Sequence, residues 1–358
     1  MQYRFGGKQK QLTFGAYPAV SLSAARQKRE EARRLLAEQT DPAEQERIKK
    51  LTRKISAANT FDAIADEWLD KARREGRAPA TLSKIEWLLD FARPTLGRRP
   101  ITDISAAEVL ATLRKVEARG RFETARRLRS TIGSVFRFAI ATARATDDPT
   151  FALRGALTTP NVKHRAALTD PIAFGGLLRA VESFDGQPTT RSALKLMALL
   201  FPRPGELRAA EWDEFDLAHR EWVIPAARTK MRRTHRVPLA PQAIQVLEEL
   251  RPITGFGRLL FPCVRSVRRP ISDGTMNAAL RRIGYSSDEM SAHGFRAVAS
   301  TLLNESGKWN PDAIERQLAH VDSDDVRRAY ARGEHWEERI LMMNWWANQL
   351  DSLKVHTR

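Results

Sequence analysis

The chain has 358 residues, 42% of them hydrophobic, which excludes a disordered protein and leaves room for two or three domains. With 60 Lys and Arg against 43 Asp and Glu, the formal net charge is +17, which favours a nucleic-acid partner over a membrane surface because the charges are spread along the whole chain. No stretch is long enough to span a bilayer, no signal-peptide core is present and Cys263 is the only cysteine, so we expect a cytoplasmic protein without a membrane segment, disulfide or cysteine-based metal site.

The first 20 residues alternate apolar and polar side chains around glycines, which predicts a short hairpin. A helix is expected over residues 23–39, with Ser21 or Ser23 as its N-cap. A charged stretch over residues 41–59 follows, and we expect it to be a partly helical linker.

Helical periodicity dominates residues 56–150, where apolar residues recur every three or four positions in what we predict to be a four-helix unit. Thr60 is placed to cap the first of these helices, and Ser105 with Glu108 has the spacing of a capping box. The polar faces favour arginine, which indicates phosphate contact, with an ordinary solvated surface as the alternative. The predicted DNA-binding residues here are Lys84, Arg126, Arg127, Arg129 and Arg137.

A Pro/Thr-rich connector over residues 151–168 is predicted to link this unit to a domain over 169–358. Helices are expected at 171–184, 191–200, 241–250, 275–283, 294–305, 311–319 and 336–350. Strands at 222–225 and 235–239 should form a hairpin, whose basic turn holds the further DNA-binding candidates Arg228, Arg232 and Arg233. The predicted fold class is mainly α with a small antiparallel sheet.

Cations, imidazoles and a phenol follow one another in the C-terminal half in an order suited to cutting a DNA backbone. They are Arg203, Lys230, His293, Arg296, His320 and Tyr330. Arg203 lies between two prolines at a predicted helix start, where a guanidinium can grip an anion bidentately. Tyr330 stands among charged residues, and its phenol needs neighbouring cations to attack at neutral pH because a free phenol titrates near pH 10.

Each of these residues has a plainer alternative when it is taken alone. Arg203 and Glu206 could form a structural ion pair at i, i+3, and Lys230 could be a solvated residue of a basic turn. His235 could be a simple sheet residue. The joint order, and not any single residue, favours phosphate chemistry.

Taken together, these segments resemble the tyrosine recombinases, or phage-type integrases, and most closely the branch encoded by satellite phages and genomic islands. The matching motifs are Arg203-Pro-Gly-Glu-Leu-Arg208, Thr229-Lys230, Ser291-Ala-His293-Gly-Phe-Arg296, Gln317-Leu-Ala-His320 and Val326-Arg-Arg-Ala-Tyr330. Residues 1–55 look like a remnant of the branch's arm-type DNA-binding domain, which in the family has a further segment before the strand at Tyr3. The resemblance makes 56–150 the helical core-binding (SAM-like) domain and 169–358 the catalytic tyrosine recombinase domain.

The resemblance implies a site-specific recombinase that cleaves and rejoins duplex DNA at attachment sites through a 3′-phosphotyrosine, to integrate or excise a mobile element. Arg203 and Arg296 would clamp the scissile phosphate, Tyr330 would attack it and Lys230 would protonate the departing 5′ oxygen. His293 would assist proton transfer and His320 would hydrogen-bond the phosphate. Glu206 and His235 would support the site. No metal and no cofactor is implied.

The family also implies a homotetramer on DNA, an excisionase, a DNA-bending host protein and a location at the bacterial nucleoid. A heptad-like seam, Trp336, Ile340, Met343, Ala347 and Leu350, is predicted to dock on a neighbouring protomer, with packing against its own domain as the alternative. Two other functions stay open from the sequence. One is a DNA-binding regulator with the same fold and no chemistry, and the other is a relaxing enzyme like the type IB topoisomerases.

Overall fold

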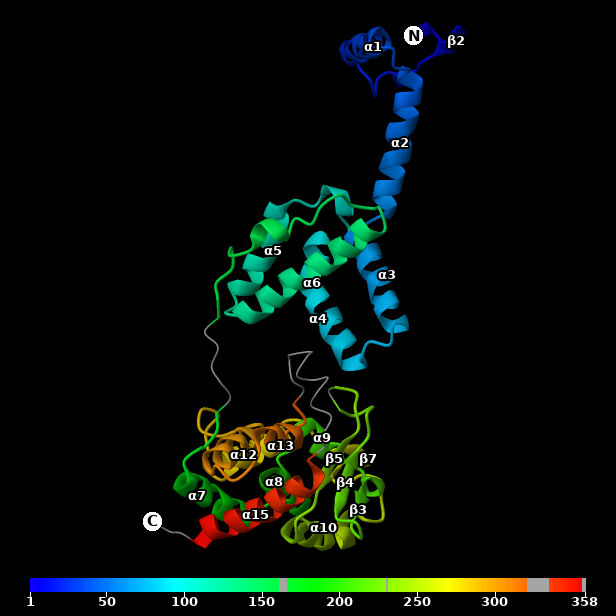
Figure 1. The fold of residues 1–358 in the computed structure, drawn as a ribbon. Coiled ribbons are helices and arrows are strands. Elements are labelled where there is room, and N and C mark those ends of the chain that lie inside the picture. The colour runs from blue at the N-terminus through cyan, green and yellow to red at the C-terminus, as the bar shows by residue number, and fades with distance from the viewer. Residues whose placement is uncertain (161–165, 230, 321–334, 356–358) are drawn as a thin grey trace. The chain divides into compact units, whose positions relative to one another are not determined.

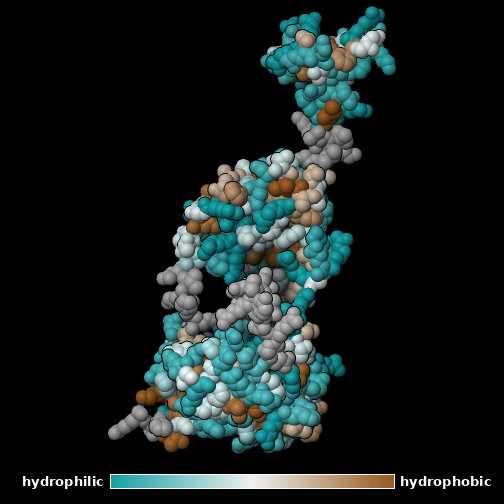
Figure 2. Space-filling model, viewed as in Figure 1, coloured by the Kyte–Doolittle hydropathy of each residue, from teal (hydrophilic) through white to brown (hydrophobic). Residues whose placement is uncertain are grey.

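The computed structural model describes residues 1–160, 166–229, 231–320 and 335–355, with only the backbone described for 51–57. The chain divides into two compact units, Met1–Val162 and Lys163–Arg358 (Figure 1). The division falls inside the predicted connector. None of the described helices is long and apolar enough to cross a membrane, and the face shown in Figure 2 is largely hydrophilic on both units.

The first unit opens with the predicted hairpin, in which β1 (Gln2–Phe5) pairs antiparallel with β2 (Lys8–Gln11). Two glycines with positive φ form its turn, as a tight hairpin requires. The predicted helix follows as α1 (Leu22–Ala37), with Ser21 as its N-cap. The expected partly helical linker is instead one helix, α2 (Pro42–Ala58). The buried Tyr3 hydroxyl donates to Asp41 Oδ1 at 2.5 Å, which ties the hairpin to the start of α2.

The predicted four-helix pattern of the first unit is also confirmed. Its helices are α3 (Phe61–Arg74), α4 (Pro79–Leu96), α5 (Ala106–Glu117) and α6 (Phe122–Ala141), with single turns η1 (Ile101–Asp103) and η2 (Phe151–Leu153). Their apolar faces meet in one core that includes Phe61, Leu89 and Ile132. The capping box is present, since Glu108 N donates to Ser105 Oγ at 3.3 Å and Ser105 N donates to Glu108 Oε2 at 2.9 Å.

Helices surround a buried helix in the second unit. They are α7 (Pro171–Glu182), α8 (Pro188–Leu200), α9 (Pro204–Arg208), α10 (Pro241–Thr254), α11 (Thr275–Arg282), α12 (Gly294–Glu305), α13 (Pro311–Gln317) and α15 (Trp336–Val355). Nearly every residue in the second half of α8 is buried, because α7, α10, α11, α12 and α15 pack around it. A helix that is apolar on all sides is expected at such a central position.

Small antiparallel sheets complete the second unit, so the predicted fold class is correct. The predicted hairpin is β4 (Glu221–Ile224) paired with β5 (His235–Pro238), and η3 (Trp212–Glu214) leads into β3 (Phe215–Asp216), which pairs with the other edge of β4. A second hairpin, β6 (Pro262–Cys263) with β7 (Ser266–Pro270), was not predicted. A two-residue strand is too short to show alternation, and β7 is mostly exposed and arginine-rich, so neither carries the usual strand pattern.

The seam on the last helix lies inside the protein's own second unit. Met343, Ala347 and Leu350 are buried, and Trp346 Nε1 donates to Ala198 O on α8 at 3.0 Å. Packing against its own domain, the alternative considered above, therefore describes this structure. The helix also continues to Val355, beyond the predicted end at residue 350.

Candidate active site

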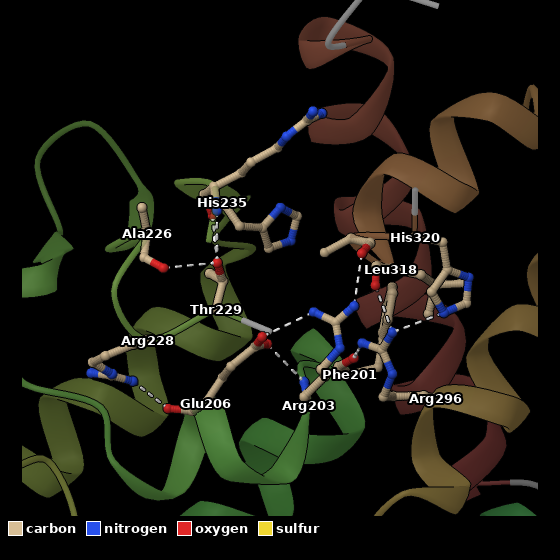
Figure 3. Close-up of polar contacts among 12 residues, drawn as sticks. Phe201, Arg203, Glu206, Ala226, Arg228, Thr229, His235, Arg296, Leu318 and His320 are labelled. Carbon is tan, nitrogen blue, oxygen red and sulfur yellow. Dashed lines mark hydrogen bonds and ion pairs between the residues drawn. The ribbon is translucent and has the colours of Figure 1, made fainter. Parts of the chain in front are cut away.

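Arg203 occupies the N-cap position of α9, with Pro204 in the first turn as predicted. Its Nη1 donates to Glu206 Oε1 at 2.9 Å, and its backbone N–H donates to Glu206 Oε2 at 3.2 Å. The i, i+3 ion pair therefore exists, and Glu206 is only 5% exposed. This ion pair uses Arg203 Nη1, and Nη2 donates to Ala319 O at 2.8 Å. The guanidinium is therefore held in one orientation (Figure 3).

Arg296, on the first turn of α12, is 5% exposed and yet surrounded by acceptors. Its Nη1 donates to Phe201 O at 2.9 Å, and its Nη2 donates to Leu318 O at 2.5 Å and faces His320 Nε2 at 3.1 Å. The pKa of this guanidinium is lowered to about 10, first by burial and then by the neighbouring charge of Arg203. Arg296 therefore stays cationic at neutral pH.

Three consecutive backbone oxygens at the end of α13, which we call the α13 carbonyls, hold the site together. Gln317 O faces His235 Nε2 at 3.2 Å, Leu318 O accepts from Arg296, and Ala319 O accepts from Arg203. Carbonyls at a helix C-terminus lack intrahelical partners and carry partial negative charge, which favours cations. Two guanidinium groups and an imidazole are thus oriented by one helix end.

His320 bridges Arg296 and an acidic side chain. Its Nδ1 lies 2.8 Å from Glu315 Oε2, and its Nε2 faces the Arg296 donor. Because a guanidinium can only donate, this network assigns the imidazole proton to Nδ1. The side chain is 47% exposed, so the ring borders the opening of the site.

His235 is a neutral imidazole within the same cluster. Its pKa is lowered to about 3, first by burial and then by the charges of Arg339, Arg203 and Arg296, against the opposing effect of the Gln317 carbonyl. Because that carbonyl can only accept, His235 Nε2 carries the proton. His235 was predicted only as a supporting residue, and it lies in the cleft with Arg203 and His320.

Other basic residues line this open cleft. They include Arg233, Arg236, Arg316 and Arg339. Arg316 and Arg339 were not singled out from the sequence. Arg316 directly precedes the Gln317-Leu-Ala-His320 motif, which was a usable signal. No sequence pattern indicates that Arg339 on α15 borders the same cleft as Arg203.

Two of the predicted catalytic residues, Lys230 and Tyr330, lie outside the described residues. His293 is the N-cap of α12, three positions before Arg296. In the described part of the chain, no three histidine, cysteine or acidic side chains come together in a way that would hold a metal ion.

The three arginines of the predicted basic turn have different surroundings. Arg228 forms an ion pair with the buried Glu214 and donates to Glu206 O, so its contacts favour a structural role over the predicted DNA contact. Arg232 and Arg233 are exposed. Thr229 Oγ1 accepts from Arg233 N at 3.0 Å and donates to Arg233 O at 2.7 Å.

Most of the DNA-binding candidates of the first unit are exposed on α4 and α6. Arg127 pairs with Glu123 at 2.7 Å, and Arg137 pairs with Asp148 at 3.1 Å. Arg127, Arg126 and Lys84 all lower the pKa of the Glu123 carboxyl, first through the Arg127 hydrogen bond and then through charge, so these three cations surround one acid. Arg129, on the same helix, is only partly buried.

Family models match nearly the whole chain. Residues 1–49 match an arm DNA-binding domain, 61–156 match a phage integrase central domain and 175–335 match the phage integrase family. The sequence is 38% identical over 367 residues to the putative protein IntB of Escherichia coli K12, covering 98% of this chain and 91% of that protein.

Two further relatives agree with these matches. The integrase of Enterobacteria phage P4 is 38% identical over 369 residues, covering 98% of this chain and 83% of the phage protein. Among solved structures, a lambda integrase tetramer bound to a Holliday junction has a similar fold, with a TM-score of 0.62 at 21% identity over 90% of this chain and 94% of that one.

Proposed function

The chain belongs to the phage integrase family of site-specific tyrosine recombinases, and from this membership we propose how its own residues cleave and rejoin DNA. The family favours neither a purely DNA-binding regulator nor a type IB relaxing enzyme. The observation that carries the proposal is the pair of oriented guanidinium groups, Arg203 and Arg296, beside two imidazoles.

In this proposal the scissile phosphate binds in the cleft against Arg203 and Arg296. Their positive charges stabilise the pentacoordinate transition state, and the cost of orienting them is met during folding by Glu206 and the α13 carbonyls. His320 hydrogen-bonds the phosphate from the opening of the cleft, and Glu315 holds its ring through Nδ1. His235 stays neutral and supports the site.

Tyr330 is the proposed nucleophile: its phenolic oxygen bonds to phosphorus while the bond to the 5′ oxygen breaks. Lys230 protonates the departing oxygen, and His293 assists proton transfer. The other tyrosines suit this role less well. Burial and a hydrogen bond to Asp41 raise the pKa of Tyr3, and burial raises the pKa of Tyr285, so both phenols are harder to ionise. Tyr17 lies in the N-terminal segment next to Pro18.

A nicked suicide substrate carrying the element's junction sequence tests the proposal. The wild-type chain should form a covalent adduct that survives denaturant. Tyr330→Phe should bind the same DNA with a similar Kd. It should form no adduct, because phenylalanine has no phenolic oxygen to bond to phosphorus. An adduct formed by Tyr330→Phe would remove Tyr330 as nucleophile.

Two other results would support the alternatives. DNA binding by the wild-type chain without any adduct would favour the regulator, and relaxation of a plasmid without an attachment site would favour the topoisomerase-like enzyme.

We further propose that residues 1–55, 56–150 and 169–358 act as arm-binding, core-binding and catalytic parts, joined by the connector 151–168, on DNA attachment sites at the bacterial nucleoid. Exposed cations on α4, on α6 and in the turn at Arg232 and Arg233 would meet phosphates. The tetramer of lambda integrase on a Holliday junction supports assembly as a homotetramer. An excisionase and a DNA-bending host protein complete the proposed set of partners.

The last helix is the proposed site of exchange between protomers, through a swap of contacts that form here within one chain. Deleting the residues after Arg339 would not test this, because it removes Trp346 and Leu350 from the core. Leu341 is 62% exposed on α15, so Leu341→Glu can disturb a contact between protomers and spare the core. We expect it to reduce synaptic complexes in native gels and to leave single-site binding unchanged. Unchanged synapsis would argue against α15 as the contact.

A further inference from the structure

The first turns of α15 reach the active site through Arg339. This arginine is 4% exposed and borders the same cleft as Arg203, His235 and His320. Its Nε and Nη2 donate to Gln317 Oε1 at 2.9 and 2.8 Å, and its Nη2 also donates to Arg236 O on β5. One guanidinium therefore joins α15, the end of α13 and the strand that carries His235.

Gln317 is the residue through which these contacts reach the catalytic groups. It is 2% exposed, its side chain accepts from Arg339, and its backbone oxygen, the first of the α13 carbonyls, faces His235. Because Arg339 offers only donors, the amide oxygen must face it. Gln317 Nε2 then has no hydrogen-bond partner among the described residues. A buried unpaired N–H costs stability, so this arrangement is better explained by placement of the helix end than by stabilisation of the fold.

We propose that Arg339 is a positioning residue for DNA cleavage, which holds Gln317 so that the α13 carbonyls orient His235, Arg296 and Arg203. The inference rests on the proposed function, and Arg339 acts through Gln317 rather than on the phosphate. It follows that the catalytic groups are fully oriented only while the first turns of α15 are docked. Docking of the last helix and assembly of the site are thereby coupled.

A purely structural role for Arg339 makes a different prediction. If the arginine only anchored α15, loosening the other end of the helix should have a similar effect. Lys354 provides that control, because it pairs with Glu182 at 3.3 Å and Asp351 at 3.1 Å near the end of α15. It has no contact with Gln317 or the α13 carbonyls among the described residues.

The experiment compares Arg339→Met, Arg339→Lys, Gln317→Met, Gln317→Glu and the control Lys354→Met in the full chain. The single-turnover rate of adduct formation is measured at saturating suicide substrate, and the DNA Kd is measured separately. We expect Arg339→Met and Gln317→Met to slow adduct formation on the order of 10- to 100-fold, because a small misplacement of catalytic groups has effects of this size. Their Kd should change by less than about twofold, as for an interaction used only in the transition state.

The conservative variants separate geometry from charge. Gln317→Glu should keep a rate close to wild type, because a carboxylate accepts both Arg339 donors. Arg339→Lys should be slow, because an ammonium lacks the planar fork. In imidazole NMR titrations of Arg339→Met, the pKa of His235 should rise, because one of the three cations that lower it is gone.

Several results would overturn the proposal. A weaker Kd with an unchanged rate would make Arg339 a DNA contact, and an equal loss in Lys354→Met would make it a simple anchor. Gln317→Glu as slow as Gln317→Met would contradict the role of the amide oxygen, and this pair decides the matter even if the Arg339 variants fail to fold. Failure of the wild-type chain itself to form an adduct would instead contradict the proposed function.

Discussion

Phe201 and Ala319 both adopt left-handed backbone conformations, with φ of 41° and 50°, which residues other than glycine rarely adopt. Each offers its carbonyl to an arginine of the candidate site, Phe201 to Arg296 at 2.9 Å and Ala319 to Arg203 at 2.8 Å. Backbone strain of this kind persists where the surrounding structure requires it, commonly at functional sites. Here the strained residues bring carbonyl oxygens to guanidinium groups that would otherwise be costly to bury.

The low pKa of His235 predicts a specific dependence of stability on pH. An unfolded chain takes up a proton on this histidine near pH 6.5, but the folded chain does so only at about pH 3. The unfolded state therefore binds more protons between these values, and the free energy of unfolding falls as the pH drops through this window. His235→Gln keeps an N–H donor for Gln317 O. In this variant the free energy of unfolding should change less steeply with pH, by an amount that corresponds to up to about one bound proton.

Urea denaturation at pH 7 and pH 5 measures this difference between the two proteins. Only the change between the two pH values matters, so a uniform loss of stability in the variant does not affect the result. Equal pH dependence in both proteins would show that His235 titrates normally in the folded chain.

At the scale of single elements, α4 and α6 place Lys84 and Arg126 at the surface around Glu123, whereas Arg137 is already paired with Asp148. Each exposed cation that neutralises a DNA phosphate releases counterions. We therefore expect Arg126→Ala and Lys84→Ala each to reduce the slope of log K against log salt by about 0.9. Arg137→Ala is the matched control and should have a smaller effect.

Fluorescence anisotropy with the core site across a salt series gives these slopes. If Arg126→Ala and Lys84→Ala reduce the slope no more than the control Arg137→Ala does, these helices do not contact phosphates in the way proposed.

Elements with a strong local signal could be predicted from the sequence. The capping box at Ser105, the hairpin β4–β5 and the proline at the start of α9 each rest on neighbouring residues, and each is present. β3 and the hairpin β6–β7 could not be predicted, because short or exposed strands gain their order from tertiary pairing.

At the scale of the whole molecule, the sequence indicated the fold class and the candidate residues, but not how they are held. The chain order of Arg203, Arg296 and His320 can be read from the sequence, because the proposed chemistry depends on these side chains. The α13 carbonyls are backbone groups, which any sequence possesses, and Arg339 approaches Gln317 only after α15 has packed. The heptad-like seam of α15 was equally compatible with a partner protomer and with the core, since both bury the same apolar stripe.

We propose that this chain cleaves DNA by forming a bond from Tyr330 to phosphorus, with Arg203 and Arg296 holding the phosphate. Mass spectrometry of the trapped adduct, after digestion of both protein and DNA, tests it most directly. We expect a nucleotide attached to the peptide that contains Tyr330, and no such peptide when Arg296 is replaced by alanine. A nucleotide attached to any other residue, such as Tyr17, would contradict it.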